Sequence, residues 1–288
     1  MSPSMLRILT LPLAAVMLGA CGGGAASPSP ELTPPAEAQV RLRVTAVRAL
    51  PPPATFGWMP SVVITLDGRV LTGGAVAAIF PGPLVGPVVE RQLSPNGWNR
   101  IVATAREAGL LGGIRDFTGG AMPGSMATRL EIVADGRVHD LVGDASRVMM
   151  CIQAPCDPQP GSPEAFGGFV SRLGDPGSFL GADIGPESMH APAGYAVLVG
   201  PPPGDQGLAQ PPIAWPFEDG FAGFGASLAD GRGGRCGMVT GEDAATLRPT
   251  LTAATSITRW RDPATGSFHG LTVRPLLPGD GDTCEGLV

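Results

Sequence analysis

The sequence predicts an α+β fold with antiparallel sheets, and three observations support this prediction. Alternating apolar and polar residues mark half-buried strands, first over residues 40–47. Asp-Gly dipeptides, which accept the backbone angles of a tight turn, join pairs of strands into hairpins. Ser-Pro dipeptides start amphipathic helices after each hairpin. We therefore predict a duplicated β-hairpin/α-helix unit, over about residues 61–110 and 129–178, followed by a C-terminal helix-strand section.

Residues 1–20 have the form of a signal peptide. Arg7 is followed by an apolar run, Ile8–Leu18, and by small residues before Cys21. A polar residue and a proline interrupt the run, which is shorter than the roughly 20 apolar residues that cross a bilayer. The sequence therefore predicts a cleaved leader rather than a transmembrane helix.

The motif Leu18-Gly19-Ala20-Cys21 resembles the lipobox of bacterial lipoproteins. This resemblance implies a diacylglycerol on the Cys21 sulfur, cleavage before Cys21, and an acyl chain such as palmitate on the freed amine. No second long apolar run follows in the sequence, so the lipid would be the membrane anchor. Residues 21–39 are rich in Gly, Ser, Ala and Pro and predict a tether. The globular part, residues 40–288, would then lie outside the plasma membrane, or at an outer membrane where a second membrane exists.

The first predicted strand is Val40–Val47, in which apolar residues alternate with polar ones. Ser61–Leu66 and Arg69–Leu71 flank an Asp-Gly dipeptide and form the first predicted hairpin. Two further apolar segments are also predicted as strands, Ala75–Phe80 and Val88–Leu93.

A helix is predicted to begin at Ser94-Pro95, with Ser as the N-cap and Pro at the first helical position. Gly109 suits the end of this helix. Its apolar residues recur at helical spacing and would form one buried face: Trp98, Ile101, Val102 and Ala105.

The same order of motifs returns 68 positions later. Asp67-Gly68-Arg69-Val70 recurs as Asp135-Gly136-Arg137-Val138, and Ser94-Pro95 recurs as Ser162-Pro163. At this offset the paired positions match in character: Val62 with Leu130, Ile64 with Ile132, Trp98 with Phe166, Ile101 with Phe169, Val102 with Val170, and Gly109 with Gly177. We interpret the pattern as two copies of one unit, whose apolar strand face covers its apolar helix face. Coincidence is the alternative, because Asp-Gly is common in turns and Ser-Pro is common at helix starts.

The C-terminal section begins with a predicted strand, Tyr195–Val199. Residues 200–222 form a connection rich in Gly and Pro. Three aromatic residues of this connection are interpreted as covering a core rather than binding a ligand: Trp215, Phe217 and Phe221.

The last predicted helix follows Thr240, which forms a weak capping box with Asp243. We expect this helix to reach Ala254 and to be interrupted at Pro249. Phe268–Pro275 is the last predicted strand.

Besides Cys21, the chain has four cysteines, and an even number in an exported domain favours disulfides. Three pairings can be drawn. We favour Cys151 with Cys156, which closes a small ring, and Cys236 with Cys284, which holds the C-terminal residues beside the start of the last helix. A zinc site is disfavoured by the spacing, and the CxxC motif of redox enzymes is absent from the sequence.

The sequence lacks the common catalytic motifs, including GxSxG, HExxH and the P-loop. His139, His190 and His269 are each interpreted as structural, because a lone histidine lacks the oriented partner that catalysis needs. Asp280-Gly281-Asp282 with Glu285 offers carboxylates for calcium, yet the spacing is not that of an EF-hand, and we prefer a solvated acidic tail. No catalytic residue, metal site or cofactor is predicted.

The formal net charge is −6, and all 19 basic residues are arginine. These arginines are scattered along the sequence. Nucleic-acid binding depends on clustered cations that neutralise phosphates, so the sequence argues against a nucleic-acid partner.

The lipobox, the tether, the DGRV hairpin, the motif Phe80-Pro81-Gly82-Pro83 and the late Arg235-Cys236-Gly237 with Trp260 are together similar to lipoproteins of high G+C bacteria. This resemblance implies an architecture and no activity. We therefore expect a non-catalytic binding or inhibitory module with a cell-envelope or extracellular protein partner. In one version, the ring Cys151–Cys156 binds a peptidase. The alternative is an exported enzyme whose site is assembled from dispersed residues.

Overall fold

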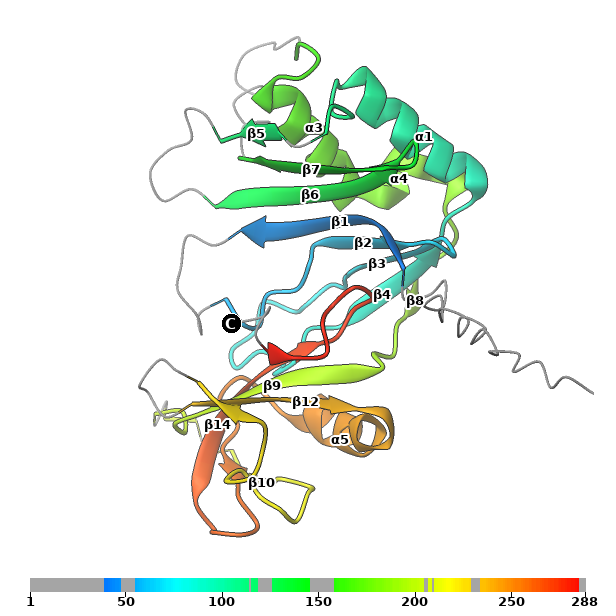
Figure 1. Cartoon of the computed structure of the whole chain (residues 1–288). Helices are drawn as coiled ribbons and strands as arrows, with labels where there is room; N and C mark the ends of the chain where they lie inside the picture. The colour runs from blue at the N-terminus through cyan, green and yellow to red at the C-terminus, as the bar shows by residue number, and fades with distance from the viewer. Residues whose placement is uncertain are drawn as a thin grey trace, which may run out of the picture. The chain divides into compact units, whose positions relative to one another are not determined.

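The structure is a computed structural model that describes residues 39–47, 55–113, 115–118, 126–145, 158–204, 207–208, 210–228 and 234–284. Within these ranges the chain forms two sheets with accompanying helices, which confirms the predicted α+β class (Figure 1). Cys21, Cys151, Cys156, Glu285, the predicted leader and residues 21–38 of the predicted tether lie outside the described residues. No helix in the described ranges is long and apolar enough to cross a bilayer.

The first sheet, as far as the structure describes it, has eight strands in the order β5-β7-β6-β1-β2-β3-β4-β8. Its central strand β1 pairs antiparallel with β2 on one side and with β6 on the other. The strands are β1 Val40–Val47, β2 Val62–Thr65, β3 Arg69–Gly73, β4 Val88–Gln92, β5 Arg115–Phe117, β6 Ala127–Ala134, β7 Arg137–Gly143 and β8 Ser188–Met189.

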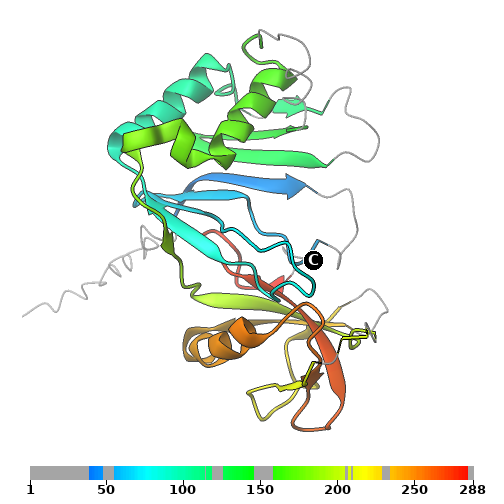
Figure 2. The same ribbon diagram turned by 180° about the vertical axis from the view of Figure 1, so that it is seen from behind.

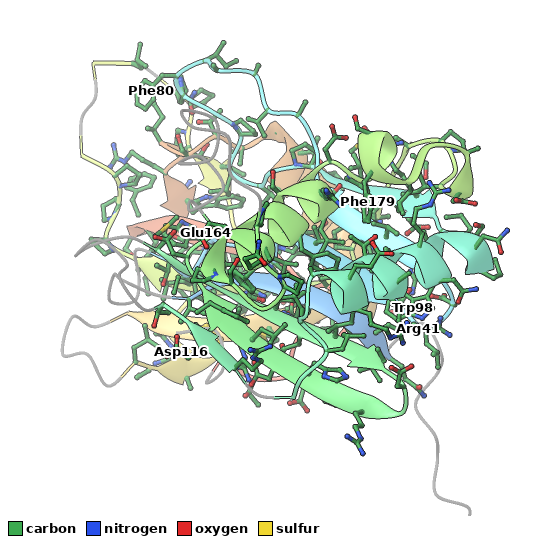
Figure 3. All side chains as sticks on the ribbon, turned by 90° about the horizontal axis from the view of Figure 1, so that it is seen from above. Arg41, Phe80, Trp98, Asp116, Glu164 and Phe179 are labelled. Carbon is green, nitrogen blue, oxygen red and sulfur yellow. A yellow bond between two sulfur atoms is a disulfide. The ribbon has the colours of Figure 1, made fainter. Side chains whose placement is uncertain are left out.

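In the described residues, three helices accompany this sheet: α1 Pro95–Glu107, α3 Pro163–Gly174 and α4 Pro176–Leu180, which continues into the 3-10 turn η2 Gly181–Asp183 (Figure 2). The predicted N-caps are confirmed, because the Ser94 hydroxyl accepts from the Gly97 amide and that of Ser162 from the Ala165 amide. Both helices turn apolar residues toward the strand side chains. One buried core includes Leu42, Val44, Val62, Ile64, Ile101, Leu130, Ile132, Phe166 and Phe169. This core covers one face of the sheet. Arg41 lies over the ring of Trp98 at its edge (Figure 3).

The two predicted hairpins form, but their turns differ in length. Ile64 pairs with Val70 in the first hairpin, whereas Ala134 pairs with Arg137 across only two residues in the second. One residue more or less in a turn moves every later side chain to the other face of the sheet. Val70 is accordingly buried, while its counterpart Val138 is 62% exposed.

The hairpins also lie on opposite sides of β1, although their helices share one core. The paired positions in the first strands of the two units are buried alike, as predicted, whereas those in the second strands are not. Gly177 lies within α4 rather than at a helix end, because α3 ends at Gly174 and Asp175 caps the next helix. The repeated order of elements is thus observed, and a duplication stays a prediction.

The strand predicted at Ala75–Phe80 is wrong. The segment is irregular, and β3 pairs instead with Val88–Gln92. The Gly74 amide donates to the Pro87 carbonyl, so the residues between them form a loop outside the strand ladder. Phe80 is 66% exposed in this loop and projects from it in Figure 3.

The second sheet, over its described residues, has the order β10-β13-β14-β9-β12-β11. β9 is its central long strand, between β14 and β12. The strands are β9 Gly194–Gly200, β10 Ile213–Ala214, β11 Ala226–Ser227, β12 Arg235–Thr240, β13 Trp260–Arg261 and β14 Phe268–Pro275. Trp215 and Phe221 are buried in the core beneath, as predicted for the aromatic residues of the connection.

Helix α5, Gly241–Ala253, packs on this core through Leu247 and Leu251. It starts after Thr240 as predicted, but the Thr240 side chain makes no capping hydrogen bond. The expected interruption at Pro249 is wrong, because the helix is continuous through that residue. Buried leucines on both sides of the proline hold the helix against the core, which offsets the one backbone hydrogen bond that proline removes.

Candidate functional site

A groove with a volume of about 520 Å³ lies on the face of the first sheet that α1 and α3 leave open. The period of two in β1 creates it, since Leu42 and Val44 point into the core and Arg43 and Thr45 point the other way. Pairing with β6 sets Glu131 beside Arg43. We call this cavity the arginine groove. Its lining residues are Arg43, Thr45, Ala46, Val47, Thr55, Trp58, Met59, Arg129, Glu131, Arg274, Gly279, Asp280 and Gly281.

The opposite wall is formed by Arg274 of β14 and by the segment after it. The Asp280 side chain is 1% exposed, and its carboxylate accepts hydrogen bonds from both Arg43 and Arg274. The distance to Arg274 Nη2 is 2.6 Å. The other carboxylate oxygen accepts from the Leu277 amide at 2.8 Å. One carboxylate therefore joins the two sheets.

The expectation of a solvated acidic tail is wrong for Asp280. Its amide donates to the Leu277 carbonyl, which closes a turn and directs the carboxylate inward between the two arginines. Asp282, two positions later, is exposed. The two carboxylates of the motif thus have opposite environments.

Two guanidinium groups share one carboxylate at this end of the groove, which leaves an excess of one positive charge. Burial lowers the pKa of Arg274, Asp280 raises it, and the like charge of Arg43 lowers it further. Within the described part of the chain, Arg274 Nε and Thr55 Oγ1 are buried without a hydrogen-bond partner. Buried polar atoms are normally paired. This end of the groove therefore favours an anion.

The other end of the groove is acidic, because one arginine faces two carboxylates. Arg129 donates two hydrogen bonds, of 2.8 and 2.7 Å, to the Asp140 carboxylate, and lies 3.4 Å from Glu131. The side-chain hydrogen bond from Arg129 lowers the pKa of Asp140, and partial burial opposes that change. Trp58 and Met59 supply an apolar wall. The groove thus combines a cationic end, an apolar wall and an acidic end.

The segment that carries Asp280 is anchored on both sides. Leu277 packs with Val63, Leu71 and Val88 on the groove side of the first sheet. The predicted disulfide between Cys236 and Cys284 is confirmed and ties the segment to β12. The wall of the groove is therefore held by covalent and apolar contacts.

Gly279 lets this wall approach the sheet closely. Its φ is +81°, and a Cβ at this position would come within 2.7 Å of Val40 Cγ2. A larger residue would therefore push the segment away from Arg43.

The three histidines lie in separate places. His139 is buried in β7, where its Nδ1 accepts from the Gly113 amide at 3.0 Å. His190 Nδ1 lies 2.8 Å from Glu90 Oε2. His269 Nε2 lies 3.0 Å from Ser267 Oγ. Two of them thus have polar side-chain partners beside cavities of about 340 and 450 Å³.

Ser267 and His269 do not form a triad with the acid of the same cavity. Asp262 is buried there, and its carboxylate accepts from the amides of Phe221 at 3.4 Å and Ala264 at 2.9 Å. Nucleophilic catalysis requires the base to be oriented by a third group. Asp262 therefore holds the backbone at Phe221 and Ala264 in place.

Sequence reasoning missed the arginine groove because Arg43 and Asp280 are 237 positions apart. One signal was present in β14, where Arg274 stands between Val273 and Pro275 in an otherwise apolar strand end. A charged residue within a buried strand is costly unless it is paired. Nothing in the sequence names its partner.

Comparison of the chain with protein-family models, curated proteins and solved structures gives no match. Among the residues that the structure describes, no three His, Cys, Asp or Glu side chains are grouped to hold a metal ion.

Proposed function

We propose that this chain is an exported lipoprotein, held at the outer face of a membrane by lipid on Cys21, and that its globular part is a non-catalytic binding module. The lipobox-like motif and the tether support the anchor. The disulfide between Cys236 and Cys284 supports export, since disulfides persist in oxidising compartments.

The observation that carries the binding role is the shared carboxylate in the arginine groove. Arg43 and Arg274 meet a single Asp280, and Arg274 Nε is unpartnered among the described residues. An anionic group of an envelope or extracellular partner, such as a carboxylate or phosphate, would neutralise the excess charge. Trp58 and Met59 would contact the apolar part of that partner.

The anchor is tested by replacing the lipidated residue, Cys21→Ala. We expect the wild-type chain to incorporate alkyne-palmitate and to sediment with membranes, and the variant to lose both properties. A variant that sediments like the wild type would contradict a lipid anchor. Ser27→Ala, elsewhere in the predicted tether, serves as the matched control.

The groove is tested with inorganic phosphate and acetate as probes. The full chain with Cys21→Ala is labelled at methionine methyl carbons, and the Met59 resonance reports the groove. Arg43→Gln should weaken binding about tenfold, since a hydrogen bond to a charged group is lost. Glu131→Gln should tighten it, because a negative charge is removed from the lining.

The same titration contains its own control. Arg137→Gln removes an exposed arginine on the neighbouring strand β7 and should leave the affinity unchanged. If Met59 does not respond to either anion, or if all three variants respond alike, the groove is not an anion site.

An enzyme is the second candidate, and the contact between Ser267 and His269 favours it. A serine hydrolase would release alcohol from a simple ester, with the rate abolished by Ser267→Ala. We expect equal rates for the wild type and the variant, because the carboxylate of Asp262 is bonded to backbone amides. A rate that falls only in Ser267→Ala would favour the enzyme instead.

A further inference from the structure

A second cavity, with a volume of about 340 Å³, lies between the loop before β4, the residues joining β8 to β9, and α5. We call it the Arg248 pocket. Cavities of this size and composition hold small molecules in proteins. Most of its lining is apolar: Pro83, Val85, Pro87, Val88, Met189, Ala191, Pro192 and Leu251.

The polar end of this pocket is cationic. Arg248 Nη2 donates to the Pro192 carbonyl at 2.8 Å, and its Nε donates to the Tyr195 hydroxyl at 3.3 Å. Both acceptors are neutral. Within the described ranges, no carboxylate lies within ion-pair distance of Arg248, so its charge is not neutralised there.

Tyr195 is positioned to add a hydrogen bond. Tyr195 is buried in the core of the second sheet and is among the residues that line the pocket, and its hydroxyl contacts Arg248. Because the phenol oxygen accepts from Arg248, its own hydrogen stays available to an acceptor. Two donors therefore converge at one end of an apolar cavity.

The acid at the edge of the pocket has other partners. Glu90 Oε2 lies 2.8 Å from His190 Nδ1 and 3.8 Å from Arg69 Nη1. His190 lines the pocket, while Glu90 does not. The pocket therefore keeps a positive end that suits an anionic ligand group.

We propose that the Arg248 pocket binds a small monocarboxylate with an apolar tail. The carboxylate accepts hydrogen bonds from Arg248 and Tyr195, and the tail lies along Val85, Met189 and Leu251. This site is separate from the arginine groove and does not depend on the function proposed for that groove. Such a carboxylate can derive from a fatty acid or from an amino acid, and the test distinguishes these sources.

The test uses the full chain with Cys21→Ala, labelled at methionine methyl carbons. Met189 lines the Arg248 pocket and Met59 lines the arginine groove, so each cavity has its own reporter. Octanoate should shift the Met189 resonance saturably and leave that of Met59 in place. The uncharged analogue 1-octanol should bind about tenfold more weakly.

A second carboxylate, N-acetyl-leucinate, separates the two sources. Tighter binding of octanoate identifies a fatty acid, and tighter binding of N-acetyl-leucinate identifies an amino-acid carboxylate. Equal affinity of octanoate and 1-octanol, or an unchanged Met189 resonance with both carboxylates, would overturn the proposal. A response of Met59 to phosphate is a separate result that concerns the groove alone.

Three variants complete the test. Arg248→Gln and Tyr195→Phe should each weaken octanoate binding about tenfold, since each removes a hydrogen bond to the carboxylate. Arg137→Gln, an exposed arginine on β7, should change nothing. Because Arg248 also fastens Pro192, circular dichroism must show each variant folded, and Tyr195→Phe tests the site without changing charge. Unchanged octanoate affinity in both Arg248→Gln and Tyr195→Phe would exclude the proposed site.

Discussion

At the scale of single residues, the most consequential side chain is Asp280. It is buried and is the carboxylate that faces both Arg43 and Arg274. Removing one partner from a buried ionic cluster leaves the remaining charges uncompensated. The stability of the molecule therefore depends on an acid that the sequence places in a run of exposed residues.

We predict that Asp280→Asn lowers the free energy of unfolding by about 3–5 kcal/mol, the usual effect of breaking a buried ion pair. Urea denaturation followed by tryptophan fluorescence measures the change. Asp282→Asn removes an exposed acid from the same segment and should change the free energy by less than about 0.5 kcal/mol. Equal effects of the two variants would show that Asp280 is not paired in solution.

Asp140 gives the molecule a specific sensitivity to acid. Its pKa is lowered by the hydrogen bond from Arg129, so ionised Asp140 stabilises the folded state. This contribution is present above the unfolded pKa of about 3.9 and is lost as the pH falls through the lower folded value. We predict that Asp140→Asn flattens the loss of stability below about pH 4.

The measurement is a series of urea denaturations from neutral pH into acid, for the wild type and for Asp140→Asn. Asp219→Asn, at an exposed position, is the control. Parallel curves for the wild type and Asp140→Asn would mean that Arg129 does not hold the carboxylate.

At the scale of elements, the chain offers a matched set of helix caps. Ser94 and Ser162 accept backbone hydrogen bonds at the starts of α1 and α3, whereas Thr240 precedes α5 without one. Ser94→Ala and Ser162→Ala should each cost about 1 kcal/mol of unfolding free energy. Thr240→Ala should cost clearly less. Thermal or urea denaturation of the three variants measures this ranking, and a reversed order would contradict the assigned caps.

Local patterns predicted most of these elements, because their causes lie within a few residues. The Ser-Pro caps at 94 and 162, the alternation in β1 and the strand Phe268–Pro275 are confirmed. The strand predicted at Ala75–Phe80 failed because strand pairing is decided by a partner, and β3 pairs with β4. Propensity indicates what a segment can form, and long-range pairing selects among the choices.

The fate of the second hairpin shows the same limit. Val70 and Val138 occupy equal positions in the DGRV motif, yet one is buried and the other exposed. The motif does not state how many residues the turn uses, and that number decides the face. The arginine groove and the Arg248 pocket could not be predicted from the sequence, because each is assembled from segments that only tertiary structure brings together.

At the scale of the whole molecule, the disulfide between Cys236 and Cys284 joins the second sheet to the segment that closes the groove. It spans 48 positions. A loop of that length implies a loss of about 4 kcal/mol in unfolding free energy when the bond is removed. We predict a loss of about 2–4 kcal/mol for Cys236→Ala with Cys284→Ala.

Denaturation of the double variant, beside the reduced wild type, measures this effect. The titration of Met59 with phosphate should weaken in parallel, because the wall that carries Asp280 is less restrained. A double variant as stable as the oxidised wild type would show that apolar contacts of Leu277 alone hold the segment.

The ion pair between Arg43 and Asp280 also implies an order in which the walls of the groove form. During synthesis Arg43 is added early, and its partner Asp280 is added only 237 positions later. Contacts between distant positions form late in folding, since the entropy of closing a long loop must first be overcome. Every nascent chain therefore passes through a stage in which β1 is made and the groove has no second wall. The ligand binding proposed for this site therefore requires the completed chain.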